Sequence, residues 1–476
     1  MDKDARIAEL EDQNAALLRR LAELEARVAA LSKTSRTSSK PPSSDIVKPP
    51  PPPESTPEGS KGASGDKGKK GKKKRKPGGQ PGHDKHTRTP FAAEQIDQAY
   101  DYDFAPGDTP GDDWEALDDF HVLQQVELRD NPLLITEHRF MRYRHRVTGQ
   151  ILTTPVPEDL RRQGLLGPRL RATTALLKGR CHVSYRQVQA FYRDVLGLDV
   201  STGQLAKVVK QCGDALGEPY AELHAKLCDQ PVVNVDETGH REQDQHGNTR
   251  SWLWCAVAER FSVFKVVASR AAKVLEELLG TDYRGIVGSD FFSAYRKFVA
   301  EGQAQAAYCW AHLVREVRYL TTLSDKVVVR WATKLLDEIK ALFKAYHRRD
   351  ERVNFRDNFR GQHKARDAIL KRVRRPAQRK EARTLADRIR TNADAYFLFL
   401  DDDRVEPTNN KAERALRHAV IDRRITQGTR GQPGSRWLER FLTIHETCRQ
   451  QDRPLLDYLV QAITHHTAGK PVPGLV

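Results

Sequence analysis

Apolar residues in the first 32 positions recur with a strict seven-residue period. The two series of core positions are Ile7, Asn14, Leu21 and Val28, and Leu10, Leu17, Leu24 and Leu31. This 3-4 spacing predicts a coiled coil over residues 1–32. The polar residue Asn14 at a core position favours a parallel two-stranded register. We therefore expect this segment to pair two copies of the chain; the alternative is an amphipathic helix packed on its own domain.

The hydrophobic pattern disappears over residues 33–90. Ser, Thr and Lys come first, then a proline run from Pro49 to Pro53, then Gly/Lys-rich sequence. This composition predicts a disordered basic linker. Its densest cationic cluster contains Lys72, Lys73, Lys74 and Arg75. We expect these side chains to contact DNA phosphates without regard to sequence; the alternative is a solvated tail.

Residues 91–158 show short alternating runs typical of a small β-rich module. Val122, Gln124, Val126 and Leu128 share one face, and two further runs, Leu133 to Met141 and Ile151 to Val156, flank a turn at Thr148-Gly149. Residues 159–228 instead predict helices, with a break at Gly197. Ser201 and Gln204 fit a capping box at the start of the next helix.

A helix, a short Gly-containing turn and a second helix form the helix-turn-helix pattern. Lys207 and Lys210 would then lie on the exposed face of the second helix and contact DNA. Two packed helices with no DNA role remain the alternative.

From residue 229 the pattern changes to buried strands. Val232 to Asp236, Trp252 to Val257 and Phe261 to Ala268 predict an antiparallel meander, followed by a helix over Lys273 to Leu279. Further strands are predicted over Ile286 to Asp290 and Ala304 to Tyr308, before a helix over Trp310 to Leu320. This order is typical of a ribonuclease-H-like α/β fold over residues 229–420, with a basic helical insertion over 313–400. A C-terminal helical tail would follow over 421–476.

Three carboxylates lie at the ends of predicted strands or at the start of a predicted helix. Asp236 and Asp290 each end a predicted strand, and Glu413 opens a predicted helix. Two Mg²⁺ ions ~3.5–4 Å apart catalyse phosphoryl transfer in many enzymes, and Mg²⁺ binds hard oxygen ligands. Two strand-end aspartates and a helical glutamate therefore form a candidate set for two Mg²⁺ ions, with Mn²⁺ as a substitute. From the residues alone, Glu237 competes with Asp236 for this role.

Four further residues are secondary candidates. Asn410 and Arg417 share a helix face with Glu413 and could orient it or contact DNA. His240 and His312 could assist near the metal, although structural histidines are the alternative for both.

Charge and cysteine usage narrow the choice of partner. The 476 residues carry a formal net charge of +16, and 30% are charged, which indicates a polyanionic partner and favours nucleic acid over membrane. No apolar run approaches the ~20 residues needed to span a bilayer, and the charged N-terminus lacks a signal peptide, so we expect a cytoplasmic location near the nucleoid. The six cysteines include no CxxC pair, which argues against a cysteine-rich zinc site.

Several sequence blocks resemble the insertion-sequence-66 family of bacterial DDE transposases. They are Lys76 to His83, Val235 to Gly239, Ser289 to Tyr295, Cys309 to Leu313 and Pro407 to Ala415. The resemblance implies that Asp236, Asp290 and Glu413 form a catalytic triad and bind the metal ions, and that Asp236 rather than Glu237 belongs to it. Family members usually carry a four-cysteine zinc module, but residues 91–158 contain no cysteine, and His145 and Thr148 stand where a cysteine pair is expected. We therefore expect no zinc there.

The resemblance implies a DNA transposase that binds the terminal inverted repeats of its element, as a homodimer or a larger synaptic assembly. Strand cleavage and strand transfer would depend on Mg²⁺, and small companion proteins of the same element would assist. Two alternatives stay open: a catalytically silent dimeric DNA-binding protein derived from a transposase, and a metal-dependent nuclease that cuts without joining.

Overall fold

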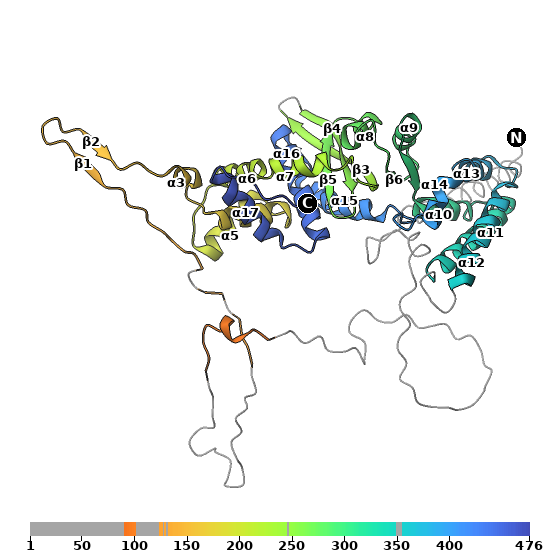
Figure 1. Cartoon of the computed structure of the whole chain (residues 1–476), viewed down its shortest axis with the longest axis horizontal. Helices are drawn as coiled ribbons and strands as arrows, with labels where there is room; N and C mark the ends of the chain where they lie inside the picture. The colour runs from red at the N-terminus through yellow and green to blue at the C-terminus, as the bar shows by residue number, and fades with distance from the viewer. Residues whose placement is uncertain (1–89, 101–122, 127, 130–131, 245–246, 349–354) are drawn as a thin grey trace, which may run out of the picture. The chain divides into compact units, whose positions relative to one another are not determined.

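A computed structural model describes residues 90–100, 123–126, 128–129, 132–244, 247–348 and 355–476 (Figure 1). The predicted coiled coil over residues 1–32 lies outside the described residues. So does the linker up to residue 89, including Lys72, Lys73, Lys74 and Arg75. The contacts divide the chain into two units, the smaller ending at His138 and the larger containing Arg139–Val476.

The predicted β-rich module is only partly present. The prediction of a strand from Leu133 to Met141 is wrong, because residues 132–141 have irregular backbone and Leu134 and Ile135 are almost fully exposed. An alternating run forms a stable strand only when another surface covers its apolar face. Two three-residue strands, β1 (Arg142–Arg144) and β2 (Ile151–Thr153), pair in antiparallel fashion. They enclose the predicted turn, where Gly149 has a positive φ of 75°.

Residues 159–228 are largely helical, as the pattern predicted. This segment contains α3 (Glu158–Gln163), α4 (Pro168–Gly179), α5 (Tyr185–Leu196), α6 (Thr202–Ala215) and α7 (Gly217–Ala225). Gly197 ends α5 in the left-handed conformation, and Ser201 caps α6 by accepting a hydrogen bond from the Gln204 amide. At Ser201 the predicted capping box has this hydrogen bond but lacks the reciprocal one from the Ser201 amide to the Gln204 side chain. The complete reciprocal box belongs to Ser184 and Gln187 at the start of α5.

A mixed sheet follows, with strand order β5-β4-β3-β6-β7. Its strands are β3 (Val232–Asp244), β4 (Gly247–Val257), β5 (Ser262–Val267), β6 (Ile286–Ser289) and β7 (Gln305–Tyr308). The first three form the predicted antiparallel meander, whereas β6 runs parallel to β3 and β7 parallel to β6. A short strand, β8 (Thr429–Arg430), also pairs with β3. Asp236 lies within the central strand β3, which continues to Asp244, so the prediction that this strand ends at Asp236 is wrong. The strand is longer because residues 237–244 pair with residues 247–254 of β4.

Helices cover both faces of this sheet. On one face, α15 (Asn410–Thr426) and α16 (Gly431–Gln450) bury Leu253, Cys255 and Val257 of β4. On the other, α8 (Lys273–Leu279) and α9 (Ser293–Glu301) share a core with Val233 and Val235 of β3. Because α15 runs past residue 420 and α16 packs on β5, the helices that cover the sheet extend into the segment predicted as a separate tail.

The predicted basic insertion is helical. It contains α10 (Trp310–Leu320), α11 (Lys326–Tyr346), α12 (Phe355–Val373), α13 (Lys380–Thr391) and α14 (Ala393–Phe397), followed by the 3₁₀ turn η3 (Leu398–Leu400). Together with Ala306 and Ala307 of β7 they form a second core, in which α11 and α12 lie side by side (Figure 1). The chain closes with α17 (Leu455–Thr467). No helix in the described part of the chain is long and apolar enough to cross a bilayer.

Candidate active site

Asp236 lies on the central strand with carboxylates nearby. Its register partner on β4 is Cys255, which packs against Ala412 and Ala415 of α15. Burial raises the pKa of Asp236 well above its usual value, and the negative charges of Glu237, Glu413 and Asp290 raise it further. The three carboxylates predicted to bind metal are therefore close enough to interact electrostatically, although Asp290 and Glu413 lie 123 positions apart in the sequence.

The other two carboxylates are placed by the ends of their elements. Asp290 follows β6, and its Oδ1 accepts a hydrogen bond of 2.9 Å from the amide of Phe292, just before α9. Glu413 lies in the first turn of α15, with its amide bonded to the carbonyl of Asn409. The end of β6 thus positions Asp290, and the start of α15 positions Glu413. Both carboxylates lie near Asp236.

Glu237, the sequence competitor of Asp236, has other partners. Its side chain lies on the opposite face of β3, because successive residues of a strand alternate. There, Oε1 accepts hydrogen bonds from Arg270 at 2.8 and 2.5 Å, and Oε2 accepts one from the Tyr295 hydroxyl. The Arg270 guanidinium is also stacked between Trp252 and Phe292. Glu237 is thus occupied by a cation and a phenol.

His312 is close to Glu413, whereas His240 is not. The Nδ1 atom of His312 lies 3.6 Å from Oε1 of Glu413. His240 is buried four residues further along β3 than Asp236, about 13 Å at the usual strand rise. It hydrogen-bonds the hydroxyl of Thr429 at 3.0 Å, and its burial lowers its pKa. His240 therefore supports the junction with β8 rather than the carboxylates.

One cluster in the described part of the chain contains nitrogen and sulfur ligand atoms. The sulfur of Cys309, an imidazole nitrogen of His312 and a carboxylate oxygen of Glu413 all lie within 4.8 Å of one another. Burial raises the pKa of the Cys309 thiol to about 11, although backbone amides that donate to its sulfur oppose this. Without a metal ion the thiol keeps its proton near neutral pH, whereas a bound metal ion would displace that proton. Glu413 belongs both to this group and to the three carboxylates, whose hard oxygen atoms are the ligand type that Mg²⁺ prefers.

The residues predicted to contact DNA are located as follows. Lys207 and Lys210 are both exposed on α6, as expected. Asn410 is the first residue of α15 and is half-buried, and Arg417 is exposed one turn beyond Glu413. The neighbouring Asn409, which the sequence reasoning missed, is 2% exposed and hydrogen-bonded to β3. Its position just before a helix, where Asn is a favoured residue, was a signal that could have identified it.

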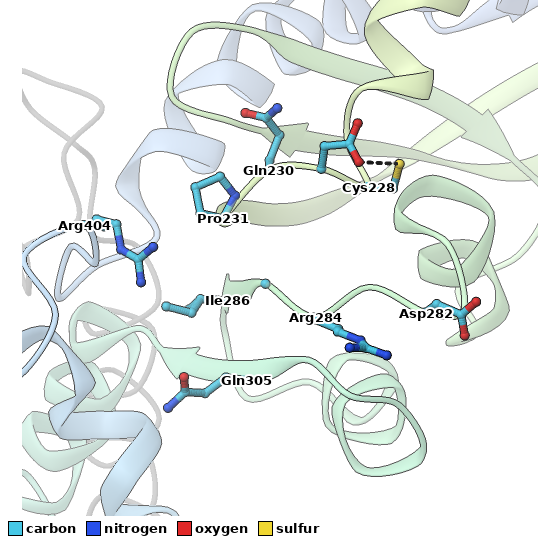
Figure 2. A pocket seen from close by; sticks show the side chains of 10 residues that line it. Cys228, Gln230, Pro231, Asp282, Arg284, Ile286, Gln305 and Arg404 are labelled. Atoms are coloured by element: carbon cyan, nitrogen blue, oxygen red, sulfur yellow. Dashed lines mark hydrogen bonds between the residues drawn. The ribbon is translucent and has the colours of Figure 1, made fainter.

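A pocket opens at the other end of the parallel strands (Figure 2). Its lining includes Pro231 just before β3, Ile286 at the start of β6 and Gln305 at the start of β7. Cys228 at its rim hydrogen-bonds Asp229 at 3.7 Å. Asp236 and Asp290 lie further along β3 and β6, so this pocket is separate from the carboxylates.

Comparisons with known proteins agree with this arrangement. The family model described as "Transposase IS66 family" matches residues 163–436, which include the helices before the sheet, the sheet itself and all three carboxylates. A second model, "Family of unknown function (DUF6444)", matches residues 2–89. The first match covers more than half of the chain and defines its class as a transposase. The chain belongs to the IS66 transposase family.

Two proteins of Sinorhizobium fredii (strain NBRC 101917 / NGR234) are similar over most of the chain. Uncharacterized protein y4qI is 26% identical over 366 residues, which cover 69% of this chain and 65% of that protein. Uncharacterized protein y4hP is 25% identical over 334 residues, covering 63% and 60% respectively. The match thus spans less than two thirds of the length of either relative.

Proposed function

We propose that this chain is a DNA transposase that cleaves the ends of its element and joins them to target DNA. The supporting observation is the convergence of Asp236, Asp290 and Glu413 from two strands and a helix, with Glu237 held on the other face by Arg270. The mixed sheet, in which β6 runs parallel to β3, is consistent with the predicted ribonuclease-H-like core, the fold in which such a triad is expected. The family membership supports the same reaction.

The carboxylates fit a site for two Mg²⁺ ions. The charge that Glu413 and Asp290 place beside Asp236 makes ionisation of Asp236 unfavourable, and a cation would relieve this repulsion. Asp236, Asp290 and Glu413 would together hold the ions. When bound, Mg²⁺ neutralises negative charge at the phosphate group and stabilises the attacking and leaving oxygen atoms.

The reaction would proceed in two displacements at phosphorus. Water attacks the phosphodiester at the element end, the bond from phosphorus to the 3′-oxygen breaks, and a free 3′-hydroxyl remains. That hydroxyl then attacks a target phosphodiester, forms a new P–O bond and releases a 3′-hydroxyl of the target strand. The exposed Lys207 and Lys210 on α6 would bind the DNA phosphates that position the ends.

The test is cleavage and strand transfer on DNA that carries the element's ends, with Mg²⁺, comparing wild type with Glu413→Gln. Gln keeps the size of the side chain but removes its charge. We expect loss of both products with DNA binding retained. Wild-type cleavage without joined products would favour a nuclease. Binding without any metal-dependent product, with companion proteins supplied, would favour a silent DNA-binding protein.

A further inference from the structure

Asn409 is a buried asparagine whose polar groups are all engaged. It is 2% exposed and directly precedes α15. Its Nδ2 donates to the carbonyl of Val235 at 2.7 Å, and its Oδ1 accepts from Nδ2 of Asn234 at 3.0 Å. Its backbone amide donates to Sγ of Cys309 at 3.2 Å. Buried polar groups that are fully hydrogen-bonded hold one arrangement, because any shift leaves a donor or acceptor unpaired.

The partner of Asn409, Asn234, also contacts the strand that leads to Asp290. Asn234 and Gly288 are register partners in the parallel pair β3 and β6. A Cβ built on Gly288 would overlap Nδ2 of Asn234, so only glycine leaves room for this amide. The Asn234–Asn409 pair thus lies where β3, β6 and α15 meet. Asn234 precedes Asp236 by two residues, Gly288 precedes Asp290 by two, and Asn409 precedes Glu413 by four.

Further contacts hold the two ends of α15, one to α10 before the helix and others to β3 near its end. Before the helix, the carbonyl of Pro407 accepts a hydrogen bond of 2.9 Å from the amide of Trp310. Near the end of the helix, Arg423 donates to the Thr238 hydroxyl at 3.2 Å and to the Gly239 carbonyl. Glu413 therefore lies on a helix that is tied to β3 at both ends.

The side chain of Glu413 is not held by hydrogen bonds of its own. Among the described residues, nothing donates a hydrogen bond to its buried Oε1, and Nδ1 of His312, at 3.6 Å, is likewise without one. The carboxylates of Glu413 and Asp236 also repel each other, and the charge of Glu413 raises the pKa of Asp236 for this reason. The backbone of α15 must therefore keep Glu413 close to Asp236.

We propose that Asn409 is a positioning residue that keeps Glu413 within metal-sharing distance of Asp236. This inference rests on the proposed function, because it assumes that the carboxylates bind metal together. Partners that orient metal ligands typically contribute about 10–100-fold to metal affinity.

The test compares Asn409→Ser with Asn392→Ser in the full-length protein, with Mn²⁺ as the probe. The Asn409 side chain makes no cap hydrogen bond to α15, so Ser removes both side-chain bonds to β3 without removing a cap. Asn392 undergoes the same change before α14, where its Nδ2 donates to the carbonyl of Arg388 within the helical insertion. Mn²⁺ affinity is measured by electron paramagnetic resonance, and folding by thermal unfolding. Asp236→Asn and Glu413→Gln serve as references.

We expect Asn409→Ser to weaken Mn²⁺ binding by about 10-fold or more and Asn392→Ser by less than about 3-fold, with both proteins folded. Asn234→Ser removes only one of the bonds and decides in the same way if Asn409→Ser does not fold. Wild-type Mn²⁺ affinity in these variants, with weakened binding in both references, would overturn this inference alone. Wild-type affinity in both references would overturn the proposed metal site as well.

Discussion

Asp236 and Glu237 are neighbours in β3, yet their side chains lie on opposite faces of the sheet. Asp236 is opposite Cys255, in the core under α15, whereas Glu237 is opposite Trp254, in the core with Tyr295 of α9. Two adjacent carboxylates thus have different environments. One faces other carboxylates, and the other faces a guanidinium and a phenol.

This difference predicts different effects for two isosteric substitutions. Asp236→Asn should lower the rate of cleavage by at least about 100-fold, because it removes a charge that binds metal. The free energy of unfolding should stay equal or rise, since one of several buried like charges is lost. Glu237→Gln should retain metal binding but lower the free energy of unfolding by about 1–3 kcal/mol, because Arg270 loses its anionic partner. Cleavage assays and urea unfolding of the two variants provide the comparison. A Glu237→Gln protein of wild-type stability that cannot bind Mn²⁺ would reverse the assignment.

Lys207 and Lys210 test the DNA role of α6. Both side chains are exposed, so Lys207→Glu with Lys210→Glu should leave the unfolding temperature unchanged. DNA binding should weaken, and the slope of log K against log salt should fall by about two, since two phosphate contacts are lost. Fluorescence anisotropy at several salt concentrations measures both quantities. Lys470→Glu, an exposed charge reversal after α17, is the control; because it changes the net charge by half as much, a loss about half as large in this variant would show that only net charge matters.

Three neighbouring histidines predict how the stability of the protein changes as the pH falls. His445 stacks on His418, and His418 contacts His182, whose Nδ1 lies 3.1 Å from Oδ1 of Asp422. Burial, together with the charges of His418, Arg180, Arg449 and His182, lowers the pKa of His445 to about 3. The native state therefore binds this proton less readily than the unfolded chain, whose histidines titrate near pH 6.5.

It follows that the stabilisation due to His445 is complete above pH 6.5 and is lost as the pH falls from 6.5 towards 3. The expected slope is at most about 1.4 kcal/mol per pH unit. His445→Phe keeps a ring against Phe441 and should flatten this slope, whereas His466→Gln at an exposed position of α17 should not. Urea unfolding between pH 4.5 and 7.5 measures the slopes; identical slopes in wild type and His445→Phe would contradict the prediction.

The sequence predicted the elements better than it predicted their contacts. Short β-branched runs bounded by turn residues gave β3 to β7, and 3.6-residue periodicity gave α8 and α10, because both patterns record burial of one face. The same reasoning failed for Leu133 to Met141, since a local pattern does not reveal whether another surface covers it. Asp290 and Glu413 were identified from their places at element ends, whereas Asp236 was identified from a predicted strand end that lies inside β3 in the structure. Asn409 and Asn234 were missed, because their partnership spans 175 positions and is visible only in three dimensions.

The central claim, that Asp236 binds a catalytic metal ion, is tested most directly by Asp236→Cys in strand transfer with Mg²⁺ and with Mn²⁺. A thiolate binds Mg²⁺ poorly but is accepted better by softer ions. Our account predicts no joined product with Mg²⁺ and a partial return of product with Mn²⁺, with DNA binding unchanged in both. Wild-type amounts of joined product with Mg²⁺ would show that Asp236 is not a metal ligand and would contradict the account.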